Sequence, residues 1–153
     1  MTVFNFTPLV NDPLADTVSA ALGVNAAGKF VEADIGKAVV IAANNNYVAA
    51  VKDNEIEGIV VALSPETVND GFSFGSVQRN GRFVVAVGAS VGAAPVVPGD
   101  PVVCDTPIAL GTAGLLQVYQ GTPSTYIWRC VRNITSAGAA GATAGDTILI
   151  ERV

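Results

Sequence analysis

Three stretches of the chain share one pattern: GKAVVI at residues 36–41, GDPVVC at residues 99–104 and GDTILI at residues 145–150. Each begins with glycine and a charged residue, continues with a small residue and ends in branched aliphatic residues. Glycine adopts the positive φ that a tight turn requires, and branched residues favour a pleated strand. The pattern therefore predicts a turn followed at once by a strand. The stretches begin at unequal intervals, so they do not establish an internal repeat.

Short apolar segments alternate with turn residues along most of the remaining chain. The segments expected to form strands are residues 39–41, 47–49, 56–63, 72–79, 82–87, 101–104, 115–119, 126–133 and 147–152. Among the turn signals, Asn80-Gly81 is the strongest, and we expect it to join its flanking strands as a hairpin. Helical periodicity is almost absent. The sequence therefore predicts an all-β fold, a compact β-barrel or β-sandwich of short antiparallel strands.

The first 28 residues differ in character from the rest. Pro8 and Pro13 interrupt an aromatic and aliphatic segment, and proline is excluded from helix interiors and central strands. Residues 15–22 allow a short helix or turn. We therefore expect an extended N-terminal arm over residues 1–28 and a single β-domain over residues 29–153. The arm either reaches a neighbouring subunit or folds back over its own core, and the sequence leaves both open.

The composition limits the partners that the chain can bind. Charged residues make up 14% of the 153 residues, against about 25% in an average globular protein. Thirteen acidic and eight scattered basic residues argue against nucleic acid, which needs clustered Lys and Arg. The apolar runs at residues 59–63 and 83–87 are far shorter than the ~20 residues of a membrane-spanning helix, and the N-terminus lacks the basic region of a signal peptide. We expect neither a nucleic-acid nor a membrane partner.

Apolar surface must nevertheless be buried somewhere in so weakly charged a chain. A partner protein is favoured over a compact Ala/Gly-rich monomer, because monomers seldom expose large apolar patches. Residues 58–63 (GIVVAL) illustrate the point, since they are apolar at every position. An antiparallel strand with one face in water would alternate. Either this strand is central in a closed structure or its second face meets another chain.

Reactive groups are scarce. Residues 88–92 (GASVG) match the G-x-S-x-G nucleophile motif, but the chain has no histidine to deprotonate the serine. Histidine is also the commonest metal ligand. Carboxylate pairs such as Glu55 and Glu57 are expected to be solvated, and Asp53, Asn54 and Glu55 lack the spacing of an EF-hand. We therefore expect no enzymatic activity, no metal and no cofactor.

Sulfur and aromatic residues carry weaker signals. Cys104 and Cys130 lie in apolar strand-like segments without metal-ligand spacing, and buried free thiols are favoured over a disulfide between them. Trp128, Tyr126 and Tyr119 would allow an aromatic binding platform. Core packing or interface anchoring is the commoner use of Trp and Tyr.

The C-terminal two-thirds of the chain resembles the small head-decoration, or capsid cement, proteins of tailed bacteriophages. The residues that carry the resemblance are NGRFVV at 80–85, VPGDPVVCD at 97–105 and AGAAGATAGDTILI at 137–150. They match a glycine-anchored apolar strand, a GD-x-V strand start, and an Ala/Gly run that leads into a final aliphatic strand. GKAVV at residues 36–40 fits the family's opening strand, whereas residues 1–28 lie outside the resemblance.

The resemblance implies a structural virion protein, often a homotrimer, that binds the outer surface of a maturing capsid and bridges major capsid protein subunits. It implies assembly in the host cytoplasm and partners that are the major capsid protein and further copies of the chain. A tail or fibre β-module with a receptor- or glycan-binding role is the alternative. Partner contacts are expected from Phe4, Phe6 and Leu9 of the arm, and from Arg79, Asn80 and Arg82 at the hairpin tip.

Overall fold

Ten β-strands and two short 3-10 helices make up the computed structural model, which describes residues 17–22, 30–42, 46–64, 73–91, 94–135 and 141–153. The strands are β1 (Thr17–Leu22), β2 (Ala38–Ile41), β3 (Tyr47–Ala49), β4 (Gly58–Leu63), β5 (Ser73–Gln78), β6 (Arg82–Val87), β7 (Pro101–Cys104), β8 (Gln117–Gln120), β9 (Trp128–Asn133) and β10 (Thr147–Arg152). The helices are η2 (Glu32–Asp34) and η3 (Ala89–Val91). The all-β prediction is confirmed, and each of the nine predicted segments overlaps a strand. No helix in these ranges is long and apolar enough to cross a membrane.

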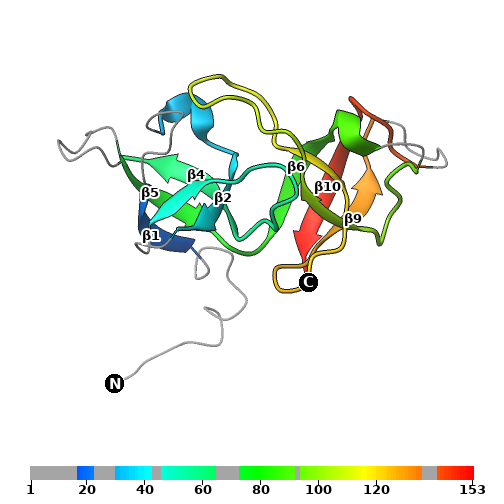
Figure 1. Cartoon of the computed structure of the whole chain (residues 1–153), viewed down its shortest axis with the longest axis horizontal. Helices are drawn as coiled ribbons and strands as arrows, with labels where there is room; N and C mark the ends of the chain where they lie inside the picture. The colour runs from blue at the N-terminus through cyan, green and yellow to red at the C-terminus, as the bar shows by residue number, and fades with distance from the viewer. Residues whose placement is uncertain (1–16, 23–29, 43–45, 65–72, 92–93, 136–140) are drawn as a thin grey trace.

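The strands form two closed five-stranded barrels that lie side by side (Figure 1). Barrel 1 has the strand order β1-β3-β2-β4-β5, and barrel 2 has the order β10-β6-β8-β7-β9. Every pairing in barrel 1 recurs in barrel 2 five strands later. The β1–β3 and β6–β8 pairs are parallel, and the four other pairs of each barrel are antiparallel. The chain therefore contains one topology twice.

The repeat extends to individual residues. The pairing of the fourth and fifth strands skips one residue in each barrel, Val61 of β4 and Val131 of β9, which marks a β-bulge. When the two registers are matched, five buried residues of one barrel correspond to five of the other. They are Leu22, Val39, Tyr47, Val60 and Val77 in barrel 1, and Val87, Val102, Val118, Cys130 and Ile150 in barrel 2. The stretches at 36–41 and 99–104 are equivalent in this match, whereas the stretch at 145–150 is not.

A glycine turn begins each of the three repeated stretches, as predicted. The φ angles are 95° at Gly36, 98° at Gly99 and 93° at Gly145. The Gly99 amide donates to the Cys130 carbonyl at 2.7 Å, and the Cys130 amide donates back to the Asp100 carbonyl at 2.9 Å. The same two-bond pattern joins Gly36 and Lys37 to Val60, and Gly145 and Asp146 to Val87. The turn therefore sets the register of the new strand against its neighbour.

Strand β4 is buried on two sides by its own chain. Successive side chains of a strand point in opposite directions, and Val60 packs in the interior of barrel 1 while Ile59 packs in the core cluster of barrel 2. Ala38, Ala50 and Ile56 also belong to that second cluster. Of the two explanations for an all-apolar strand, the central position in a closed structure holds for this part of β4.

The hairpin predicted at Asn80-Gly81 is wrong. Strands β5 and β6 belong to different barrels, and each already has two other neighbours. The local turn chemistry is nevertheless present, since Gly81 has a φ of 102° and its amide donates to Asn80 Oδ1 at 2.8 Å. These residues connect the two barrels rather than two paired strands.

Part of the predicted N-terminal arm forms a strand of barrel 1. Residues Thr17–Leu22 are β1, which pairs with β5 along its whole length, so the helix or turn expected at residues 15–22 is wrong for these six residues. Pairing with β5 overrides the weak local preference of this Ala-containing segment. Phe4, Phe6 and Leu9 lie outside the described residues, as do the remaining parts of the segment 1–28.

Candidate functional site

The two barrels meet along a seam built by residues 50–57, which connect β3 to β4. The Asp53 amide donates to the Cys104 carbonyl at 2.9 Å, and the Cys104 amide donates to the Asn54 carbonyl at 3.0 Å. Trp128 is fully buried, and its indole Nε1 donates to the Ile56 carbonyl at 2.8 Å. Main-chain hydrogen bonds therefore join the barrels in addition to their shared apolar core.

The Glu55 carboxylate adds a charged element to the seam. It accepts hydrogen bonds from the amides of Ser124, Thr125 and Tyr126 and from the Ser124 hydroxyl, at 2.5 to 3.0 Å. The Ser124 amide is the largest cause that lowers the pKa of Glu55, from 4.5 to about 2, while burial acts in the opposite direction. The expectation that Glu55 is merely solvated is wrong, because three consecutive amides of barrel 2 hold it as an anion.

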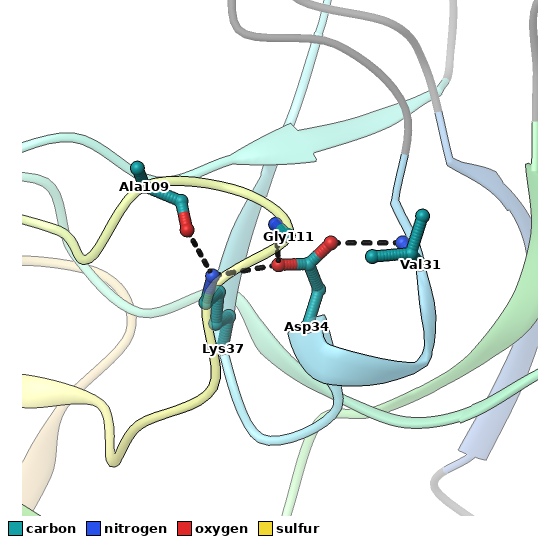
Figure 2. A network of polar contacts seen from close by, with 5 residues as sticks. All are labelled: Val31, Asp34, Lys37, Ala109 and Gly111. Atoms are coloured by element: carbon teal, nitrogen blue, oxygen red, sulfur yellow. Dashed lines mark hydrogen bonds and ion pairs between the residues drawn. The ribbon is translucent and has the colours of Figure 1, made fainter.

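A buried ion pair fastens the loop between β7 and β8 to helix η2 (Figure 2). Lys37 Nζ lies 2.6 Å from Asp34 Oδ1 and donates to the Ala109 carbonyl at 2.7 Å. Asp34 is fully buried, and it also accepts from the Gly111 amide and the Val31 amide, both at 2.8 Å. Figure 1 shows this yellow loop passing from barrel 2 to the cyan helix. Because both charges are paired and hydrogen-bonded, the network has a structural role.

The G-x-S-x-G match is explained by packing. The Ser90 amide and hydroxyl donate to the buried Asp105 carboxylate at 2.8 and 2.7 Å. Burial favours the neutral form of Asp105, but these bonds and one from the Thr106 amide outweigh it and lower the pKa of Asp105. A Cβ at position 88 would lie 2.0 Å from Asp105 Oδ2, so only glycine fits there beside the carboxylate. Ser90 therefore holds a turn.

The cysteines are free and buried, as the sequence predicted. Burial raises the pKa of Cys104 to about 12 and also raises the pKa of Cys130, so neither is a reactive thiolate at neutral pH. A cavity of about 20 Å³ between the barrels is lined by Cys104, Lys37 and Asp105 among others, and it has room for a single water. Within the described ranges, no three His, Cys, Asp or Glu side chains gather as metal ligands.

The three aromatic residues considered as a platform are engaged separately. Trp128 lies in the core with Phe83, at a ring-centroid distance of 5.7 Å. The Tyr119 hydroxyl donates to the Asp53 carboxylate, and this bond raises the pKa of Tyr119. The Arg152 guanidinium lies over the ring of Tyr126, with its carbon atom Cζ 4.8 Å from the ring centroid. A shared platform of Trp128, Tyr126 and Tyr119 is therefore not formed.

The outer surface of β9, β10 and β6 carries most of the exposed arginines, and we call it the arginine face. It consists of Arg82, Val84, Arg129, Arg132, Leu149 and Glu151. Arg129, Glu151 and Arg82 form one row across the three strands, and Arg132, Leu149 and Val84 form the next. The bulge at Val131 lets both β9 arginines point outward although they are three residues apart.

The predicted contact residues that the structure describes are spread around this region. Arg82 belongs to the arginine face and forms an ion pair with Glu151 at 3.1 Å. Asn80 is exposed in the connection between the barrels, and Arg79 is half-buried, with its carbonyl accepting from Arg152. Sequence reasoning missed Arg129 and Arg132, because alternation would have placed them on opposite faces of a regular strand.

No protein-family model, curated protein or solved structure matches the chain.

Proposed function

We propose that this chain is a structural virion protein that decorates the outer surface of a tailed-phage capsid and stabilises it by bridging major capsid protein subunits. The observation that carries the proposal is that the described parts of the three stretches at 80–85, 97–105 and 137–150 belong to one barrel, whereas the stretch at 36–40 leads into β2 of barrel 1. Residues 80–85 lead into β6, residues 97–105 contain β7, and residues 137–150 end in β10. Segments far apart in sequence thus serve one folded unit, which supports treating the resemblance as that of a domain.

Cement proteins act by differential binding. A protein that binds the expanded shell better than the immature one shifts the equilibrium toward the expanded shell by mass action. Contacts of about 800 Å² per partner are enough for a specific interface. The seam supports this role, because main-chain bonds, the Glu55 cluster and the hydrogen bonds of Lys37 and Asp34 to the β7–β8 loop oppose separation of the two barrels.

Exposed apolar side chains support association with more than one partner. Phe74 on barrel 1 is 49% exposed and Val84 on barrel 2 is 48% exposed. Residues of this size are usually buried, and these two lie on different barrels. We include a homotrimer in the proposal, with one surface of the protein available to the shell and another to a neighbouring copy.

Co-sedimentation with capsid shells of the phage that encodes this protein tests the proposal. The purified protein should pellet with expanded shells and remain in the supernatant with immature ones, and sedimentation velocity of the protein alone should give a trimer. Failure to bind expanded shells would overturn the cement function. Deleting residues 2–12 tests the arm separately, since unchanged shell occupancy would remove Phe4, Phe6 and Leu9 from the contact.

A tail or fibre module is the second candidate. An open hollow of about 370 Å³ is lined by Asn54, Glu57 and Tyr126, among others. Amide, carboxylate and aromatic groups together suit a sugar ligand. Binding of host-surface glycans that Tyr126→Ala abolishes, with no binding to shells, would favour this function. A gene among tail genes would agree with it, whereas a gene beside that of the major capsid protein would favour cement.

A further inference from the structure

The internal repeat relates one contact of barrel 1 to the arginine face of barrel 2. In barrel 1, the paired residues Ala38 and Ile59 are buried against barrel 2. Their counterparts in barrel 2 are the paired residues Pro101 and Arg129, and Arg129 is exposed at the edge of the arginine face. One position by which barrel 1 docks on barrel 2 is therefore exposed in barrel 2, where Arg129 belongs to the arginine face.

The residues at this equivalent position differ in a way that indicates different kinds of interface. Ile59 is fully buried in a permanent contact, whereas Arg129 stands at the same position in an exposed one. Permanent interfaces resemble apolar cores, and interfaces that form between separately folded proteins combine arginine with apolar residues. The arginine face has that mixture, because Val84 and Leu149 lie beside Arg132 in one row.

The type of cation points to the partner's chemistry. All five arginines of the chain, at positions 79, 82, 129, 132 and 152, lie in or next to the strands β5, β6, β9 and β10, whereas the lysines are at 29, 37 and 52. Arginine binds carboxylates through two parallel hydrogen bonds, which lysine cannot do. Among the described residues, the ion pair of Glu151 is with Arg82, and no ion pair engages Arg129 or Arg132.

We propose that the arginine face docks on the outer surface of the major capsid protein and binds a carboxylate-rich patch there. This inference rests on the proposed cement function. The chain carries a formal net charge of −5, so an acidic shell surface repels most of the molecule and attracts this face. The same net charge disfavours a nucleic acid as the occupant. Charge therefore fixes the orientation in which the protein approaches the shell.

Charge reversal with a matched control tests the proposal on expanded shells of the same phage. Arg132→Glu and Lys52→Glu change the net charge equally, but only Arg132 belongs to the arginine face. We expect Arg132→Glu to weaken binding about tenfold and Arg129→Glu/Arg132→Glu still more, with Lys52→Glu within about twofold of wild type. Arg132→Lys should lose about threefold, because it keeps the charge without the paired hydrogen bonds.

The outcomes separate this inference from the proposed function. If the wild type does not bind expanded shells, both are overturned. If Arg129→Glu/Arg132→Glu binds as tightly as the wild type, the arginine face is not the docking surface and the cement function stands. If the double variant instead dissociates an oligomer of the protein alone, the face joins copies of the chain and the shell contact is overturned.

A salt series keeps the test decisive should the double variant fold poorly, which its circular dichroism would reveal. Raising the ionic strength from about 0.05 M to about 0.5 M should weaken wild-type binding, because exposed charge pairs are screened. Binding that is unchanged over this range would overturn a contact between the arginine face and carboxylates.

Discussion

Barrel 1 and barrel 2 share topology, register and bulge position, yet they differ at the residues that face outward or toward the seam. Equivalent interior positions hold apolar residues in both barrels, for example Val39 and Val102, or Val77 and Ile150. Ile59, which faces the seam, corresponds to the exposed Arg129, and one interior position also differs, where Gly58 corresponds to Trp128, whose indole bonds to the seam. The comparison teaches that this fold needs only a small set of interior residues. Positions outside that set are available for contacts that only one barrel makes.

The largest expected effect concerns the equivalent positions Gly58 and Trp128, where barrel 1 has no side chain and barrel 2 has a buried indole. Trp128→Ala removes a fully buried indole and leaves the Ile56 carbonyl without its donor. We expect unfolding in urea to show a loss of about 3–5 kcal/mol. Trp128→Phe should lose less, because it retains most of the apolar volume. A loss below about 1 kcal/mol for Trp128→Ala would mean that barrel 2 closes without this side chain.

The equivalent positions Lys37 and Asp100 compare a buried charge with a partly exposed one. Lys37→Met leaves the fully buried Asp34 carboxylate without its cation, and we expect a loss of about 3 kcal/mol in the free energy of unfolding. Asp100→Asn changes only the side chain that accepts from the Val97 amide and should cost about 1 kcal/mol or less. Equal losses in denaturant unfolding would contradict the structural role of the Asp34–Lys37 network.

The turn glycines should behave alike in both barrels. A Cβ at Gly36, Gly99 or Gly145 would meet no atom within 4 Å, so substitution by alanine costs only the positive φ. We expect each variant to lose about 1–2 kcal/mol in thermal or chemical unfolding. Gly36→Asn and Gly99→Asn are matched controls that should lose less, because asparagine tolerates this conformation. A large difference between Gly36→Ala and Gly99→Ala would show that the two turns are not equivalent.

The smallest expected effect concerns the seam and depends on pH. Since the folded pKa of Glu55 is about 2 and its ordinary value is 4.5, its contribution is complete above pH 4.5 and disappears as the pH falls toward 2. Glu55→Gln should therefore lower the free energy of unfolding by about 1 kcal/mol at neutral pH. The difference from wild type should vanish in acid, as measured by denaturant unfolding across a pH series. A difference that persists at pH 2 would mean that the charge of Glu55 does not matter.

Local chemistry made most of the strands predictable, whereas pairing did not follow from it. The glycine turns and branched residues at 36–41, 99–104 and 145–150 act within a few residues, and strands followed where they were expected. The Asn80-Gly81 turn formed without a hairpin, because the neighbours of β5 and β6 are chosen by distant segments. Strand β1 (TVSAAL) carried no strong local signal.

The repeat and the arginine face were hidden for different reasons. Loops of unequal length make the interval from Val39 to Val102 shorter than that from Val77 to Ile150, so no constant period exists to detect. Arg129 and Arg132 come to one face only through the bulge at Val131, which depends on the partner strand. Arg82 could be named from the sequence because of its place beside the Asn80-Gly81 turn, although its strand partners could not.

The closure of both barrels affects how neighbouring copies of this protein can interact. Each sheet closes through its short parallel pair, at Leu22 and Tyr47 in one barrel and at residues 86–87 and 117–118 in the other. A closed sheet has no free edge at which a second chain can add a strand, so neighbouring copies can stand side by side without β-aggregation. The Leu22–Tyr47 pair is the shortest in barrel 1, so we expect this barrel to open there first under heat or denaturant and to expose strand edges that can pair with other chains.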